Sequence, residues 1–213
     1  MKAAPLLKYF LVAGILACAR APKGDTPLKE SEPNSKQSLV VMTVKADDLS
    51  LNENKQKLLK ILNATSEGIG PDVVFLQNIE NQEAFNNVLS NEFSHFGYKY
   101  FALSEENEDH KQSAILSRFA FEEEPSTSDN DVFQVLLSIS PHKDLRVFLQ
   151  PKDAIYGLLD ELSEAPTGET YLVTGGDVPK LAVSKGAKFH KIALSAALKG
   201  VFPRPLIAEV IIP

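Results

Sequence analysis

The segment Val73–Leu76 constrains the fold most strongly, because it is a run of four apolar residues, VVFL, with no polar residue among them. Gly68, Gly70 and Pro71 end a helical pattern and lead into this run. A short, uninterrupted apolar run is typical of a strand that is buried on both faces. We therefore expect a sheet that is covered on both sides by other parts of the chain.

The other segments with strand or helix periodicity alternate along the chain. Strands are expected at residues 39–44, 98–103, 113–116, 132–139, 145–149, 171–174 and 206–212, and helices at 54–66, 82–93 and 154–162. Residues 141–144 are expected to join two of these strands as a hairpin, and the acidic residues 122–131 to form a solvated loop. This order of elements fits a mixed α/β (α+β) sandwich of two sheets with helices outside.

The N-terminus predicts a lipid anchor. Lys2 and Lys8 precede an apolar run, residues 9–17, that is too short to cross a bilayer and is typical of a signal peptide. Cys18, the only cysteine of the chain, follows in the sequence ILAC, which resembles the bacterial lipobox. Acyl chains contribute roughly 0.8 kcal/mol per buried CH₂, so a diacylated Cys18 would hold the chain on a membrane. The alternatives are an incidental or buried thiol, or ordinary signal cleavage.

Three regions are therefore expected: a signal peptide at 1–17, a lipidated Cys18 with a polar, proline-containing tether to residue 37, and a folded domain at 38–213. The expected location is the bacterial cell envelope, with the anchor in the outer membrane. Loss of Lys2 and Lys8 with the signal peptide would leave 20 basic and 28 acidic residues, a net charge of −8. Such a charge opposes non-specific binding to nucleic acid.

Residues 71–81, PDVVFLQNIEN, carry the clearest motif. They resemble the segment P-D-[IV]-[IV]-x-L-Q-E-[IV]-E-N of the endonuclease/exonuclease/phosphatase family, whose members have the DNase-I-like fold. In that family the glutamate after Leu-Gln binds the catalytic magnesium ion. Asn78 stands at this position here.

Further segments extend the resemblance from about residue 39 to the C-terminus. MTVKADDL, residues 42–49, resembles T-x-N-x-x-N-L with Lys45 in place of the first asparagine. AILSRF, residues 114–119, resembles the scaffold segment [IV]-x-I-L-S-R-F, which has no catalytic group. The segment 171–179 resembles the end of the G-D-x-N strand, in which Asp177 is kept and Pro179 replaces the asparagine.

The C-terminal part also matches with replaced site residues. FHKIALS, residues 189–195, resembles I-D-[HY]-I-x-x-S with His190 in place of the aspartate. VFPRPL, residues 201–206, resembles S-D-H-x-P-L with Phe202 and Pro203 in place of Asp-His. The resemblance implies a shortened DNase-I-like sandwich from which most catalytic groups have been replaced.

The resemblance also implies which chemistry has been lost. Family members hydrolyse phosphate esters with Mg²⁺, a histidine and an aspartate that activates water. Mg²⁺ prefers carboxylate ligands, whereas Asn78 offers a neutral carbonyl oxygen and Lys45 adds a positive charge. We expect no bound metal and no catalysis, with a binding or structural role and a protein or an anionic ligand as partner. Only Asp177 could still act as a base, and an active Mg²⁺-dependent phosphodiesterase or phosphatase with a rearranged site is the alternative. A purely structural envelope protein is the third possibility.

Overall fold

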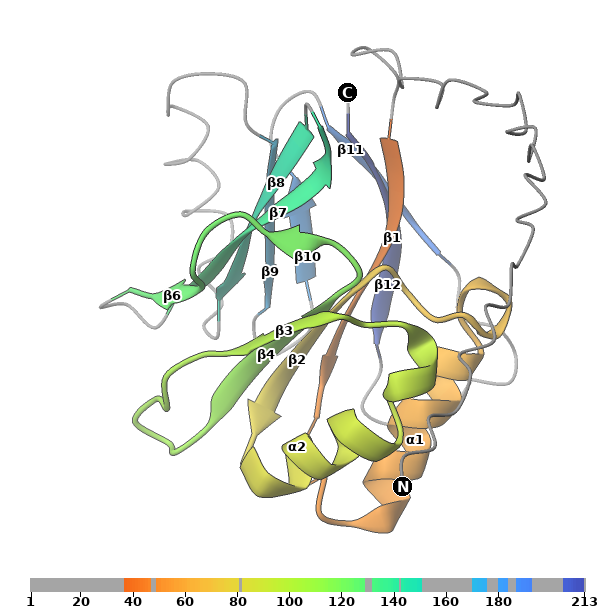
Figure 1. Cartoon of the computed structure of the whole chain (residues 1–213), viewed down its shortest axis with the longest axis vertical. Helices are drawn as coiled ribbons and strands as arrows, with labels where there is room; N and C mark the ends of the chain where they lie inside the picture. The colour runs from red at the N-terminus through yellow and green to blue at the C-terminus, as the bar shows by residue number, and fades with distance from the viewer. Residues whose placement is uncertain are drawn as a thin grey trace, which may run out of the picture. The chain divides into compact units, whose positions relative to one another are not determined.

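The computed structural model describes residues 37–46, 49–80, 82–128, 132–141, 143–150, 170–175, 180–183, 187–192 and 205–212. Two six-stranded sheets pack face to face, and helices α1 (Asn52–Asn63) and α2 (Gln82–Asn91) cover the outer face of the first sheet (Figure 1). Two short 3₁₀ turns, η1 (Ser66–Gly68) and η2 (Ser94–Phe96), each follow one helix. None of the helices in these ranges has the length and apolar character that a bilayer span requires.

The first sheet has the strand order β11-β12-β1-β2-β4-β3. Its strands are β1 (Gln37–Lys45), β2 (Val73–Ile79), β3 (Tyr100–Leu103), β4 (Gln112–Ser117), β11 (Lys188–Lys191) and β12 (Leu206–Ile212). The central strands β1 and β2 are parallel, and the others pair antiparallel. A parallel pair needs a long crossover connection, which α1 and η1 provide.

The second sheet has the order β10-β9-β8-β7-β5, with β6 paired beside β7. Its strands are β5 (Ala120–Phe121), β6 (Ser126–Thr127), β7 (Phe133–Ser140), β8 (Lys143–Gln150), β9 (Thr170–Gly175) and β10 (Lys180–Val183). Strands β7 and β8 form a hairpin, and β8 and β9 are parallel.

Two apolar layers hold the domain together. Side chains alternate along each strand, so β1 and β2 each contribute to both layers. Met42 and Leu76 pack toward the helices, where Leu58, Leu62 and Phe85 complete a buried cluster. On the other face the sheets pack on each other through side chains that include Leu39, Val41, Val73, Phe75, Ile115, Val147 and Leu172. The residues of the VVFL run are each 0% exposed, as expected of a strand covered on both faces.

Arg118, which follows β4, ties the start of β2 to the turn after η1 and to η2. Its guanidinium donates to the Asp72 carboxylate at 2.9 Å and to the carbonyl oxygens of Gly70 at 3.2 Å and Phe96 at 3.1 Å. It also lies over the Tyr98 ring, 5.5 Å from the centroid. The planar guanidinium has donors enough for several partners at once, so a single side chain can fix three segments.

The partners of Arg118 are themselves held in place. The second carboxylate oxygen of Asp72 accepts the Val40 backbone N–H at 2.7 Å, and the Tyr98 hydroxyl donates to the Pro71 carbonyl at 2.9 Å. Burial raises the pKa of Tyr98 above its ordinary value, which keeps the hydroxyl protonated as a donor; the Arg118 charge opposes this shift. The cluster therefore connects β1, β2, η2 and β4 at the end of the sheet where β2 begins.

Most expected elements are present with boundaries shifted by a few residues. The strands expected at 39–44, 98–103, 113–116, 132–139, 145–149, 171–174 and 206–212 correspond to β1, β3, β4, β7, β8, β9 and β12, and the hairpin is confirmed. Helix α1 ends at Asn63 instead of Ser66, and α2 ends at Asn91 instead of Phe93. The expected helix at 154–162 lies outside the described residues.

The sequence reasoning missed four short strands, β5, β6, β10 and β11. Strand β6 lies inside residues 122–131, so the expectation of a plain solvated loop was wrong for Ser126 and Thr127. These strands have only two to four residues, too few to show a period. They form because a neighbouring strand offers an open edge, which is a property of the assembled sheet.

Candidate functional site

Lys45 and Asn78 lie together at the carboxyl ends of the parallel strands β1 and β2. Lys45 is aligned with Gln77 in the strand register, and the Ala46 N–H donates to the Gln77 carbonyl at 2.7 Å. Asn78 is the next residue of β2. Lys45 follows Val41 and Thr43 in the strand alternation, so it lies on the face of the sheet that is turned toward the second sheet.

A β-bulge places Asn78 on the same side. The pairing of β2 with β4 shifts between Leu76 and Ile79, and both of these residues pack in the helix-side cluster. One extra residue is therefore accommodated between them, which turns Gln77 and Asn78 away from that cluster. Asn78 has φ 62°, a left-handed conformation that asparagine adopts more readily than most residues.

At the carboxyl ends of β1 and β2, the face of the first sheet that is turned toward the second sheet changes from apolar to polar. Thr43 and Gln77 are 0% and 3% exposed, and Ser113 on the neighbouring strand β4 is also buried. The Thr43 hydroxyl and the Gln77 amide nitrogen have no hydrogen-bond partner among the described residues. Leaving such a group unpaired in the interior costs about 1–3 kcal/mol. The protein therefore keeps polar groups here at a cost in stability, which is a recognised property of functional sites.

Replacement of Thr43 by valine tests this cost. Valine has nearly the same shape without the hydroxyl, so we expect Thr43→Val to leave the fold intact and to raise the free energy of unfolding by about 1 kcal/mol. Urea unfolding monitored by circular dichroism measures the change. Thr174 provides the matched control, because its buried hydroxyl donates to the Lys180 carbonyl at 2.8 Å. Thr174→Val should lower stability, and an equal loss in both variants would show that Thr43 is paired.

The carboxyl ends of β8 and β9, in the second sheet, lie at the same end of the sandwich as Lys45 and Asn78. The Glu105 N–H, just beyond β3, donates to the Thr127 hydroxyl of β6 at 3.3 Å. Thr127 is aligned with Phe133 of β7, which is aligned with Leu149 near the end of β8.

In the first sheet, Leu103 at the end of β3 is aligned with Ala114 of β4, and Ala114 with Leu76 of β2. The two alignments bring the carboxyl ends of β2 and β8 together. Gly175, aligned with Gln150, ends β9 at the same place. The polar residues of β1 and β2 therefore face the region between four strand ends.

The structure does not bring His190 to this site. His190 of β11 is aligned with Glu209 of β12, and Glu209 is aligned with Val40 of β1. Lys45 lies five positions beyond Val40, a distance of roughly 16 Å along the strand. Val40 packs against the helix-side cluster, so the exposed His190 lies on the opposite face from Lys45.

The remaining expected positions, Cys18, Asp177, Pro179, Phe202 and Pro203, lie outside the described residues. Two described neighbours indicate where these stretches of chain begin and end. Gly175 precedes the segment with Asp177, and Leu206, aligned with Thr43, follows the segment with Pro203. Both neighbours lie at the end of the sandwich that holds Lys45 and Asn78.

Sequence reasoning missed Thr43, Gln77 and Ser113. The available signal was a polar residue in or directly after an apolar strand segment, such as Gln77 after VVFL. Within the described ranges, no three His, Cys, Asp or Glu side chains gather as a metal-binding group. Two cavities, of about 330 Å³ between the helices and about 550 Å³ between α2 and β3, lie on the helix side of the first sheet, opposite the face that holds Lys45.

Comparison with solved structures identifies the architecture. Truncated TDP2 from Caenorhabditis elegans matches with a TM-score of 0.53 at 12% identity, over 82% of this chain and 97% of that one. Humanized D. rerio TDP2 matches with a TM-score of 0.56 at 14% identity, over 83% of this chain and 99% of that one. An endonuclease/exonuclease/phosphatase from Beutenbergia cavernae DSM 12333 matches with a TM-score of 0.53 at 10% identity, over 82% and 71%.

Neither a protein-family model nor a curated protein matches the sequence. At these identities the structural matches establish the fold, and they confirm the predicted DNase-I-like sandwich of two sheets with flanking helices.

Proposed function

We propose that this chain, which has the two-sheet fold of the endonuclease/exonuclease/phosphatase proteins, is a cell-envelope lipoprotein with a binding or structural role instead of metal-dependent hydrolysis. Cys18 would carry the lipid that anchors the chain in the outer membrane. The domain would then present the strand ends described above to a protein or an anionic ligand.

The juxtaposition of Lys45 and Asn78 carries the proposal. The sequence resemblance assigns the magnesium-binding glutamate to position 78 and a site asparagine to position 45. The fold places the two positions on neighbouring parallel strands. The residues present do not fit a divalent cation, because an amide replaces the carboxylate and an ammonium group is added beside it. No hydrolytic step through a metal can be assigned to this arrangement.

The same residues suit a different ligand. Lys45 supplies a positive charge at the end of β1, and Gln77 and Thr43 behind it are polar. A ligand with an anionic group would therefore complement this end of the sandwich in charge, as an ammonium group favours carboxylates and phosphates. His190, on the other face of the sheet, does not contribute to such a site.

Isothermal titration with Mg²⁺ and with Mn²⁺ tests the proposal. We expect no saturable binding at micromolar metal concentrations and no turnover of a generic phosphodiester with either ion. Single-site micromolar binding would contradict the loss of the metal site. Metal-dependent turnover that is abolished by Asp177→Ala would instead establish an active phosphodiesterase with a rearranged site.

A further inference from the structure

A groove of about 550 Å³ lies between α2 and β3, on the helix side of the first sheet. Its walls are apolar: Leu89 of α2 and Phe93 just after it line one side, and Phe101 and Leu103 of β3 line the other. Phe93 is buried, whereas the Phe101 side chain is 56% exposed. Small-molecule sites are typically apolar clefts of about 300–1,000 Å³ with a few polar groups. The groove therefore has the size and the lining of a site for a small ligand.

The two sides of the groove run in opposite directions. Helix α2 begins just after the carboxyl end of β2, and the Phe96 carbonyl that follows the helix is held by Arg118 at the start of β2. Strand β3 is antiparallel to β4, and β4 to β2, so β3 starts beside the start of β2. Lys99 therefore lies at the end of the groove where α2 finishes, and Leu103 lies at the other end. These two residues are roughly 13 Å apart along an extended chain.

The end of the groove at Lys99 is positively charged. Among the described residues that line the groove, Lys99 is the only charged one. Its N–H donates to the Ser117 carbonyl at 3.1 Å, so Lys99 continues the ladder between β3 and β4. Side chains alternate along a strand, which puts Lys99 on the same face as Phe101 and Leu103. The Lys99 ammonium group forms no ion pair within the described part of the chain.

The solvent side of the groove is polar and uncharged. Gln82, Asn86 and Ser90 follow one another at intervals of four residues on α2, and all three are exposed. Leu89 and Phe93 form a second row with the same interval, on the side of the helix that lines the groove. The apolar rows of α2 and β3 can thus cover an apolar chain while the polar row stays hydrated. A ligand that matches this lining has an apolar body and one anionic end.

We propose that this groove binds a single-chain amphiphile with a carboxylate head, namely a fatty acid of medium chain length. The carboxylate would pair with Lys99, and the acyl chain would lie against Phe93 and Phe101 toward Leu103. Charge complementarity selects an anion, because the described lining has one cation and no acidic residue. The site lies on the face of the sheet opposite Lys45, so it is independent of the role proposed for the strand ends.

Calorimetric titration of the full chain with dodecanoate, below the concentration at which it forms micelles, tests the proposal. Cys18→Ser is used throughout, so that no acyl group on the chain itself can compete. We expect saturable one-to-one binding with a micromolar dissociation constant. Butanoate has the same head without the long chain, and dodecylammonium has the opposite charge, so each should bind at least roughly tenfold more weakly. Absence of saturable dodecanoate binding, or equal affinity for the three compounds, would overturn the proposal.

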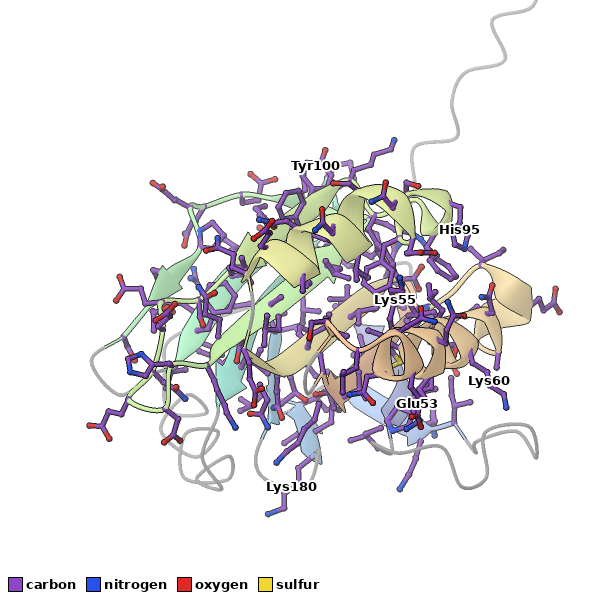
Figure 2. The ribbon with its side chains drawn as sticks, turned by 90° about the horizontal axis from the view of Figure 1, so that it is seen from below. Glu53, Lys55, Lys60, His95, Tyr100 and Lys180 are labelled. Atoms are coloured by element: carbon purple, nitrogen blue, oxygen red, sulfur yellow. The ribbon has the colours of Figure 1, made fainter. Side chains whose placement is uncertain are left out.

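Two lysine variants test the position of the carboxylate. Lys99→Gln should weaken dodecanoate binding roughly fivefold, because a partly exposed ion pair is lost, and Lys99→Arg should restore most of the affinity. The matched control is Lys60→Gln, on the exposed side of α1 and well away from Tyr100, the neighbour of Lys99 (Figure 2). This control should bind dodecanoate as the parent chain does. Equal affinities of Lys99→Gln and Lys60→Gln would contradict the pairing with Lys99.

A second pair of variants tests the apolar wall. Phe101→Glu removes apolar contact and sets a like charge against the carboxylate, so dodecanoate binding should weaken roughly tenfold. Tyr100→Glu makes the equivalent change one residue earlier, at a ring that lies 5.9 Å from the Phe121 ring on the other face of β3. It should bind dodecanoate normally, and circular dichroism verifies the fold of both variants. Equal binding by folded Phe101→Glu and Tyr100→Glu would show that the ligand does not lie in this groove.

Discussion

Arg118→Ala is expected to lower the free energy of unfolding by about 3 kcal/mol, because it breaks an ion pair and leaves several carbonyl oxygens without their donor. The Arg118 guanidinium serves Asp72 and the carbonyl oxygens of Gly70 and Phe96, and it packs over Tyr98. Alanine cannot replace any of these contacts. Urea unfolding monitored by circular dichroism at neutral pH measures the loss.

Two further variants separate the role of the guanidinium from that of charge alone. Arg118→Lys keeps the charge but loses the planar fork, so it should recover only part of the stability. Lys57→Ala removes an ion pair with Glu53 one helical turn away, at 2.7 Å on the exposed side of α1. A pair of this kind contributes about 0.2–0.5 kcal/mol. A loss in Arg118→Ala no greater than that in Lys57→Ala would show that the cluster does not stabilise the fold.

The double change Lys45→Asn with Asn78→Glu is expected to make the chain bind Mn²⁺ much more tightly than the wild type does. It replaces an amide with a carboxylate and removes a neighbouring cation. A divalent ion about 4 Å from a single charge interacts with it by roughly 8 kcal/mol at an effective dielectric constant of 20, before solvent screening. Part of this gain is lost because the introduced glutamate would occupy the left-handed conformation of Asn78, at a cost of about 1–2 kcal/mol. A dissociation constant at least a hundredfold below that of the wild type is expected by titration calorimetry.

A matched control has the same change of charge at a distant place. Lys60→Asn with Asn63→Glu makes the equivalent exchange on the exposed side of α1. This control should bind Mn²⁺ no better than the wild type does. If the Lys45→Asn, Asn78→Glu variant binds Mn²⁺ equally weakly, position 78 is not where a metal would bind in this chain. The main support for a lost metal site is then removed.

The sequence was sufficient to predict the main strands and to show that the central strand β2 is covered on both faces. The VVFL run predicted a strand covered on both faces, and the apolar residues of α1 and α2 predicted the helices that cover it. These patterns succeed because burial on two faces or on one helix face leaves a local record in residue type. Resemblance to a known family added the two-sheet architecture, which periodicity alone could not supply.

Sequence reasoning selected Lys45 and Asn78, which the parallel register brings together, and also His190, which lies on the other face. It missed Thr43 and Gln77, whose unpaired polar atoms become visible only when their surroundings are known. A motif records the order of residues, whereas a site depends on the face of the strand and on the register between strands.

The amino-acid sequence by itself determined the order of the main helices and strands and the apolar runs that form the buried layers, and its family resemblance predicted the replaced residues at positions 45 and 78. The tertiary structure alone decided that Arg118, in a segment read as mere scaffold, joins carbonyl groups 22 and 48 residues away. It also decided that β3 is the outermost strand of the first sheet within the described residues. These features depend on contacts between residues that are distant along the chain, and such contacts leave no periodic pattern in the residues that make them.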